Sequence, residues 1–264
     1  MERWLNKILL GLSEDILREM PDNCIDSIVT DPPYGLKFMG KKWDYDVPSV
    51  ALWKEAYRVL KPGAHVLSFG GTRTYHRMVV NIEDAGFEIR DQILWIYGSG
   101  FPKSLDVSKA IDKAAGEYVP GDVLPSSRAT GKSVSGIATA FRLKTAANPQ
   151  SDLSRQWQGW GTALKPAVEP ICLARKPLEG TVANNVLKWG TGAINIDGCR
   201  VGTEDNLSRP QGTMLQPMDW GNKSGGGGGF RTEGSPLGRF PANLIHDGSD
   251  EVVGEFPNVK AGVA

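Results

Sequence analysis

The 264 residues carry no formal net charge, and 40% are hydrophobic and 23% charged, which is typical of a globular protein with one domain, or one domain and a substantial insertion. No apolar run is long enough to span a bilayer, no signal-peptide core follows Met1, and Cys24, Cys172 and Cys199 lie too far apart for a metal motif. We therefore expect a cytoplasmic protein with reduced thiols, no membrane partner and no metal site, and we exclude membrane-spanning proteins and secreted precursors.

The N-terminal part of the sequence alternates between strand and helix patterns. Strands are predicted from short apolar runs bounded by turn residues, over 4–10, 25–29, 64–69 and 87–97. Helices are predicted over 13–20, 48–60 and 75–85, where Ser13 offers a capping hydroxyl and Pro48 suits a first turn. This regular alternation predicts an α/β fold with a parallel, doubly wound sheet.

The alternation fades after Pro102. A helix is predicted over 106–115, residues 116–161 are mostly small and polar, and 168–174 predict one more strand of the sheet. We divide the chain into an α/β region (1–102), a loop-rich insertion (103–164), a returning strand (165–176) and a second loop-rich region (177–264). Eleven Lys and Arg stand against six Asp and Glu between Phe101 and Lys176, an excess that could face DNA phosphates or solvent.

The stretch Asp31-Pro32-Pro33-Tyr34 directly follows the predicted strand 25–29. Because proline fixes φ and has no N–H, neither a strand nor a helix continues through it, and the result is a stiff loop at a strand end. Open α/β sheets bind ligands at such ends. A carboxylate, prolyl carbonyls and an aromatic ring suit a flat base with an amino group, because the oxygens accept from the amine while the ring stacks. In isolation the same four residues would fit an ordinary surface turn.

A loop rich in lysine and aromatic residues follows, over 37–47, and contains Lys41, Lys42 and Trp43. We interpret it as a substrate-binding segment that closes over a flipped nucleotide, with the lysines on phosphates. The alternative is a surface loop whose aromatic side chains pack on the domain. The three histidines are isolated in the sequence, and none is offered as catalytic.

Asp31-Pro32-Pro33-Tyr34 resembles motif IV of the amino-methylating DNA methyltransferases, which transfer a methyl group from S-adenosylmethionine to adenine N6 or cytosine N4. Further segments resemble the phage and prophage branch of the circularly permuted, beta-type enzymes, in which the catalytic half precedes the cofactor half. These segments are residues 21–26, 35–44, 61–63, 159–166 and 169–171. The resemblance implies a Rossmann-like methyltransferase sheet over 1–102, and a target-recognition region over 177–264.

The resemblance also implies roles for the motif. Asp31 would accept one hydrogen bond from the amine and the Pro32 carbonyl a second, Pro33 would hold the geometry, and Tyr34 would stack on the base for about 1–3 kcal/mol. The implied partner is double-stranded DNA, in restriction–modification of a bacterium or its phage. No obligatory protein partner is implied, and a homodimer is compatible with the sequence.

Asp before Pro-Pro-Tyr favours adenine N6 as the target, and cytosine N4 is the alternative. An alternative of another class is a non-catalytic DNA-binding remnant.

Two departures from the family concern the cofactor. Relatives carry Gly-Asp near the end of the first strand, whereas this chain has Gly11-Leu12, so Gly11 and the neighbourhood of Asp31 are the candidate cofactor positions. No Phe-x-Gly-x-Gly turn is found, because residues 68–71 lack the spacing and 189–192 lack a clear strand before them, and we interpret both as ordinary turns. The chain stops before the family's final cofactor segment, so we expect a fragment or a remnant.

Overall fold

The computed structural model describes residues 3–36, 40, 42–98, 100, 104–120, 148–203 and 234–256. The chain divides into two compact units, of which unit 1 comprises 1–98 with 168–264, and unit 2 comprises 99–167. No described helix is long and apolar enough to cross a membrane. The five glycines 225–229 lie outside the described residues.

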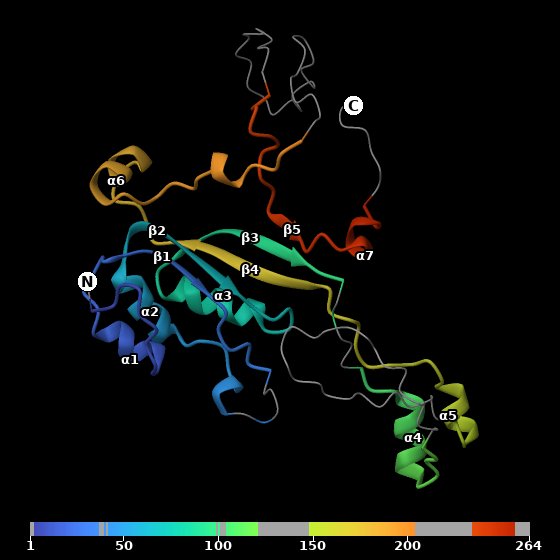
Figure 1. Cartoon of the computed structure of the whole chain (residues 1–264). Helices are drawn as coiled ribbons and strands as arrows, with labels where there is room; N and C mark the ends of the chain where they lie inside the picture. The colour runs from blue at the N-terminus through green and yellow to red at the C-terminus, as the bar shows by residue number, and fades with distance from the viewer. Residues whose placement is uncertain are drawn as a thin grey trace, which may run out of the picture. The chain divides into compact units, whose positions relative to one another are not determined.

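Unit 1 contains a mixed five-stranded sheet in the order β1-β2-β4-β3-β5 (Figure 1). The strands are β1 (Ile25–Thr30), β2 (Leu60–Phe69), β3 (Glu88–Ile96), β4 (Val168–Arg175) and β5 (Leu244–His246). β1 is parallel to β2 and β3 is parallel to β5, whereas β4 runs antiparallel to both of its neighbours. The prediction of an α/β fold is confirmed, and the predicted parallel sheet is corrected to a mixed one, because β4 runs antiparallel.

The direction of β4 follows from the path of the chain. β3 ends at Ile96, and β4 begins at Val168, which pairs with Ile96 itself. The chain therefore leaves the sheet and returns to it at the same edge, after unit 2, and a strand that enters at that edge must run antiparallel to β3. β4 lies between β2 and β3, so the strand predicted over 168–174 is a central one.

Three helices, α1 (Ser13–Arg18), α2 (Val50–Val59) and α3 (Tyr75–Asp84), lie on one side of the sheet (Figure 1). Ser49 caps α2, since its hydroxyl accepts a hydrogen bond of 3.2 Å from the Leu52 N–H. The buried face of α2 consists of Trp53, Ala56 and Val59, at helical spacing. The core lies between these helices and the face of β2 and β4 that carries Val66, Cys172 and Ala174.

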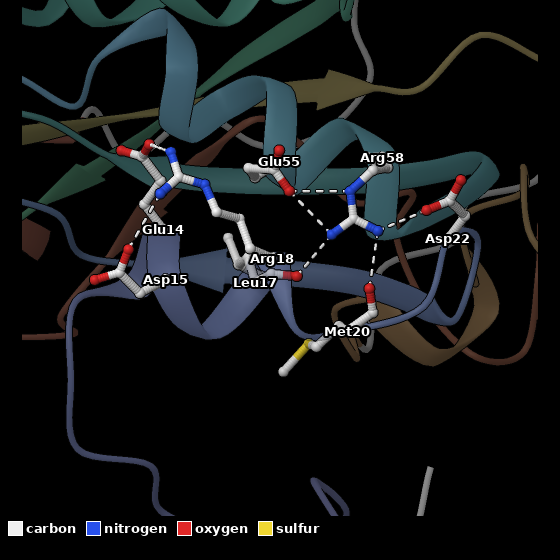
Figure 2. A network of polar contacts seen from close by, with 8 residues as sticks. All are labelled: Glu14, Asp15, Leu17, Arg18, Met20, Asp22, Glu55 and Arg58. Carbon is white, nitrogen blue, oxygen red and sulfur yellow. Dashed lines mark hydrogen bonds and ion pairs between the residues drawn. The ribbon is translucent and has the colours of Figure 1, made fainter.

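Arg58 of α2 holds the end of α1 (Figure 2). Its guanidinium donates to the backbone carbonyls of Leu17 and Met20, each at 2.8 Å, and to the carboxylates of Asp22 and Glu55. A planar guanidinium with several N–H donors can satisfy carbonyls at a helix end that have no partner inside the helix. This contact fixes the connection between α1 and β1.

The strand predicted over 4–10 is not present. Residues 3–6 form a turn, 7–10 have no regular structure, and the side chains of Ile8 and Leu10 are fully exposed. A strand requires a paired neighbour for its backbone groups, and none of the described strands pairs with this segment. The first turn of α1 also differs from the prediction, because the N-cap is Leu12 and no side chain caps it.

The remaining elements of unit 1 are α6 (Val182–Trp189), η3 (Asp197–Cys199) and α7 (Asp250–Val253). Residues 186 and 187, directly before the turn at 189–192, belong to α6, so a helix and not a strand precedes that turn. Gly190 ends this helix with a φ of 72°, so residues 189–192 form a helix-terminating turn.

Unit 2 contains α4 (Val107–Ala115) and α5 (Asp152–Gln156). Its helices are joined through Asp112, whose carboxylate accepts from the N–H groups of Gln150 and Ser151.

Candidate active site

The Asp31–Tyr34 loop leaves the sheet at the C-terminal end of β1, beside the ends of β2 and β3 and the start of β4. Thr30, the last residue of β1, pairs with Ser68, which pairs with Cys172 of β4. Asp31 is exposed, and Pro32, Pro33 and Tyr34 are half-buried. The sequence thus forms the stiff loop at a strand end that the two prolines predict.

Three contacts fix the loop from outside. The Thr74 hydroxyl donates to the Tyr34 carbonyl at 2.5 Å, and the Gly35 N–H donates to the buried Asp44 carboxylate at 2.9 Å. The Tyr34 ring packs on Gly71, where an added Cβ would lie 3.1 Å from Cδ2 of the ring. Gly71 therefore makes room for Tyr34, which agrees with its interpretation as part of an ordinary turn.

Tyr34 and Asp31 interact directly. Burial, a hydrogen-bonding interaction with Asp31 and the negative charge of Asp31 together raise the pKa of the Tyr34 hydroxyl above its usual range. A neutral phenol is a donor, so it can contribute a hydrogen bond to the Asp31 carboxylate. Asp31 is exposed, so its carboxylate keeps acceptor positions for a ligand.

Glu169 and Tyr97 lie at the same edge of the sheet as the Asp31–Tyr34 loop. The sequence patterns gave neither residue a role. Glu169 is the second residue of β4, and Tyr97 follows β3 directly. Burial and the charge of Asp31 raise the pKa of Glu169, while burial and the charge of Glu169 raise the pKa of Tyr97. The available signal was a carboxylate inside an otherwise apolar strand pattern, Val168 to Ala174.

The predicted substrate-binding segment is only partly described. Lys41 lies outside the described residues, as does the side chain of Lys42. η2 (Lys42–Asp44) is held beside the Asp31 loop by the bond between Asp44 and Gly35. Trp43 is 62% exposed, so its indole is accessible to a ligand.

A groove of about 450 Å³ lies between α1, β1 and α2, with Asp31, Pro32 and Pro33 in its lining. Leu9 and Ser13 also line it, on either side of Gly11 in sequence, whereas a Cβ on Gly11 would meet Ile16. Trp53 is 2% exposed and lines the groove as well, and its Nε1–H has no hydrogen-bond partner in the described part of the chain.

The described residues contain no cluster of three or more His, Cys, Asp or Glu that could hold a metal ion. His65 lies in β2 and His76 in α3, as predicted, and His246 ends β5. Burial and the charges of Arg175 and Arg90 lower the pKa of His65. This histidine is a neutral side chain of the sheet, and no residue of the Asp31–Tyr34 loop contributes to its pKa shift.

Comparison with known proteins gives the same family over the region that contains the site. Residues 25–176 match the family N6_N4_Mtase, described as DNA methylase. The chain is similar to the type II methyltransferase M.HindIII of Haemophilus influenzae, with 27% identity over 144 residues, which are 53% of this chain and 36% of that protein. It is also similar to M.HpaI of Haemophilus parainfluenzae, with 34% identity over 110 residues, or 36% of this chain and 33% of that protein.

Among solved structures, the PvuII DNA methyltransferase (cytosine-N4-specific) aligns with 75% of this chain and 57% of its own, at 14% identity and a TM-score of 0.34. The matched region spans about a third of the length of the two curated relatives. Because the family match covers more than half of the chain, the chain belongs to the N6/N4 DNA methylase family.

Proposed function

We propose that the chain carries the base-binding part of a DNA methyltransferase, which transfers a methyl group from S-adenosylmethionine to the exocyclic amine of a flipped base, with adenine N6 as the target. The observation that carries the proposal is the Tyr34–Asp31 pair, held at the end of β1 within the region that matches the DNA methylase family. An exposed carboxylate at a strand end, beside a phenol, suits an amine ligand.

The exocyclic amine of a base is a weak nucleophile, because its lone pair is delocalised into the ring. Asp31 would accept one hydrogen bond from the amine and offset the positive charge that develops on nitrogen. The Pro32 carbonyl would accept the second hydrogen bond. Because neither a strand nor a helix continues through the two prolines, this carbonyl is not committed to a regular backbone hydrogen bond. Tyr34 would stack on the base. These contributions are positioning and electrostatic stabilisation.

The residues at this edge fit the reacting end of S-adenosylmethionine. That cofactor supplies a methyl group on a positively charged sulfur. Asp31 and Glu169 interact electrostatically, and their carboxylates would stabilise a cation between or beside them. Gly70 and Gly71 do not contribute a cradle, since an added Cβ would meet Met78 and Tyr34 respectively.

Support for adenine comes from the resemblance of Asp31-Pro32-Pro33-Tyr34 to the adenine enzymes, and cytosine N4 is the alternative within the same chemistry. The permuted arrangement, the phage or prophage origin, double-stranded DNA as the partner and a homodimer stay predictions. The division into catalytic, insertion and target-recognition regions is likewise a proposal.

The test is methylation of mixed-sequence DNA by the purified chain, followed by digestion and mass spectrometry of the nucleosides. N6-methyl-2′-deoxyadenosine is the expected product, and N4-methyl-2′-deoxycytidine would replace the adenine proposal with its alternative. Calorimetric titration with S-adenosylmethionine in parallel tests cofactor binding separately. If the chain binds DNA but neither binds the cofactor nor methylates any base, the result would support the alternative that it is a non-catalytic DNA-binding remnant.

A further inference from the structure

We propose that Glu169 is a second carboxylate of the same site, and that it accepts the proton which the amine loses on methylation while Asp31 orients the amine. The inference rests on the proposed function, and it assigns a residue that the Asp-Pro-Pro-Tyr loop does not contain.

The strand pairings bring Glu169 to the site. β4 enters the sheet antiparallel, so its first residues lie level with the last residues of β2 and β3. Glu169 pairs with Trp95 of β3, and the carbonyl of the next residue, Pro170, accepts a 3.0 Å hydrogen bond from the N–H of Gly70. Asp31 follows β1 at the same end of the sheet. Two carboxylates far apart in sequence therefore lie at the same edge of the sheet, near enough for the charge of Asp31 to act on Glu169.

Glu169 also lies on the side of the sheet away from α3. Ser68 and its partner Cys172 belong to the face that contacts α3, where the Ser68 hydroxyl lies 3.2 Å from Sδ of Met78. Since side chains alternate along a strand, Ile171 and Glu169 point to the opposite face. α1, α2 and α3 all lie on the first side (Figure 1), so they do not cover Glu169. Its carboxylate is half-buried at the sheet edge.

The acids that support the fold are held by partners, and Glu169 is not. Asp44 accepts from Gly35, Asp112 accepts from Gln150, and Glu88 pairs with Arg175. Across the described ranges, no N–H, hydroxyl or cation bonds to the Glu169 carboxylate. A half-buried carboxylate without a partner is costly for stability, which a role in binding or proton transfer would explain.

The surrounding groups favour protonation of Glu169 over that of an ordinary glutamate. Asp31 after β1 contributes a negative charge, and Tyr34 and Tyr97 are neutral phenols near it. β2 ends at Phe69 next to Glu169, and Gly70 and Gly71 follow it; none of these three residues titrates. Burial and the Asp31 charge raise the pKa of Glu169, and a carboxylate with a raised pKa is the better proton acceptor.

The proposed step balances. The amine nitrogen uses its lone pair to bond the methyl carbon of the sulfonium donor, whose sulfur keeps the electron pair of the broken carbon–sulfur bond. The nitrogen then carries a positive charge, and the proton that had been hydrogen-bonded to the Pro32 carbonyl transfers to the Glu169 carboxylate, which passes it to water. Asp31 remains a hydrogen-bond acceptor from the other N–H throughout.

The first arm of the experiment does not depend on activity. The chain is labelled with ¹³C at glutamate side-chain carboxyls, and the pH titration of Glu169, assigned with the Glu169→Gln variant, is compared in wild type and in Asp31→Asn. The expected result is a raised pKa in wild type that falls in the variant, because one negative charge has been removed. An unchanged titration in Asp31→Asn would overturn the inference.

The second arm measures methyl transfer by Glu169→Gln, Glu169→Asp and the matched control Glu83→Gln, on an exposed residue of α3. We expect Glu169→Gln to lower kcat by about 10²–10⁴-fold with KM for DNA unchanged, and to lose the acid limb of the pH profile. Glu169→Asp should recover part of the rate. If Glu169→Gln were as active as Glu83→Gln, the inference would be overturned. An inactive wild type would overturn the proposed function instead, and the titration of Glu169 would then be the test of its interaction with Asp31.

Discussion

The hydroxyl of Thr74 donates a 2.5 Å hydrogen bond to the backbone carbonyl of Tyr34. Thr74 is the N-cap residue of α3, and its side chain makes this bond outward to the Asp31 loop and leaves the first turn of the helix uncapped. The loop is therefore tied to an element of the core through its backbone. A base-binding loop fixed in this way keeps its geometry before the ligand arrives, which lowers the ordering cost of binding.

Replacement of the Asp31 carboxylate should separate chemistry from binding. Asp31→Ala removes the acceptor that orients the amine, so methyl transfer should fall by about 10²–10³-fold or more while DNA affinity changes little. Asp84→Ala, on an exposed residue of α3, is the matched control and should retain wild-type activity. Filter binding and a radioactive methyl-transfer assay give the two readouts. Parallel loss of affinity and rate would contradict the catalytic assignment.

Stacking predicts an order of effects at Tyr34. Tyr34→Ala should weaken binding of an extruded base by about 1–3 kcal/mol, whereas Tyr34→Phe and Tyr34→Trp should retain most of the affinity. The measurement is fluorescence of a DNA duplex that carries 2-aminopurine at the target position. A phenylalanine variant as defective as alanine would show that the hydrogen bond to Asp31, and not the ring, is the main contribution of Tyr34.

Gly71 allows a test of the loop from outside its motif. In Gly71→Ala the new Cβ would lie 3.1 Å from the Tyr34 ring, so the ring must shift by a few tenths of an ångström. We expect weaker base binding with little change in thermal stability. Gly202→Ala, where no atom lies within 4 Å of the added Cβ, is the control and should be silent in both assays. A silent Gly71→Ala would mean that the position of the ring is not critical.

The stability of the α1–α2 connection should depend on Arg58 and hardly on Arg18. Arg58→Ala removes a donor from the Leu17 and Met20 carbonyls and from two carboxylates, of which the Leu17 carbonyl keeps the Met20 N–H, at an expected cost of about 1–3 kcal/mol in urea denaturation. Arg18 pairs only with Glu14 and Asp15 at the surface of α1 (Figure 2), so Arg18→Ala should cost less than about 1 kcal/mol. Equal losses would mean that the Arg58 contacts are no stronger than surface ion pairs.

Unit 2 should lose order in acid through Asp112. Although burial opposes its ionisation, hydrogen bonds from the backbone N–H groups of Gln150 and Ser151 and from the Ser151 hydroxyl lower the pKa of Asp112. The unfolded segment therefore binds a proton more readily. The stabilisation is complete above the unfolded pKa of about 4, and declines as pH falls through the lower folded value.

Hydrogen exchange over 148–157 checks this acid dependence, with faster exchange expected as pH drops below about 4 after correction for intrinsic rates. Asp112→Asn should exchange quickly at all pH values, because it lacks the ionised acceptor. A pH-independent opening in wild type would contradict the role of Asp112.

Elements with a strong local signal could be predicted from the sequence. α2 has a capping serine at position 49 and an apolar stripe, α3 has a comparable stripe, and both lie within two residues of their predicted bounds. α4 begins after the capping carboxylate of Asp106 and ends at Gly116, as its composition indicates. The Asp31 loop follows from its two prolines. In each case the physical cause acts within a few residues of the chain.

Features that depend on partners could not be predicted. The apolar run 7–10 has strand composition but no paired strand in the described structure, so it stays irregular. The place of β4 between β2 and β3 depends on pairings across long sequence separations, and the proximity of Glu169 to Asp31 depends on that place. A sequence pattern can indicate that a residue is in a strand, but not which residues from other strands will surround it.

The central position of β4 has a consequence for synthesis on the ribosome. β2 and β3 emerge first, and the strand that joins them emerges only after the whole of unit 2. At about 5–20 residues per second, the delay is on the order of several seconds. Throughout it, β2 has one unpaired edge and β3 has two, and such edges are where nascent chains aggregate. The yield of soluble protein should therefore fall as the segment between β3 and β4 is lengthened, even if the finished fold is equally stable.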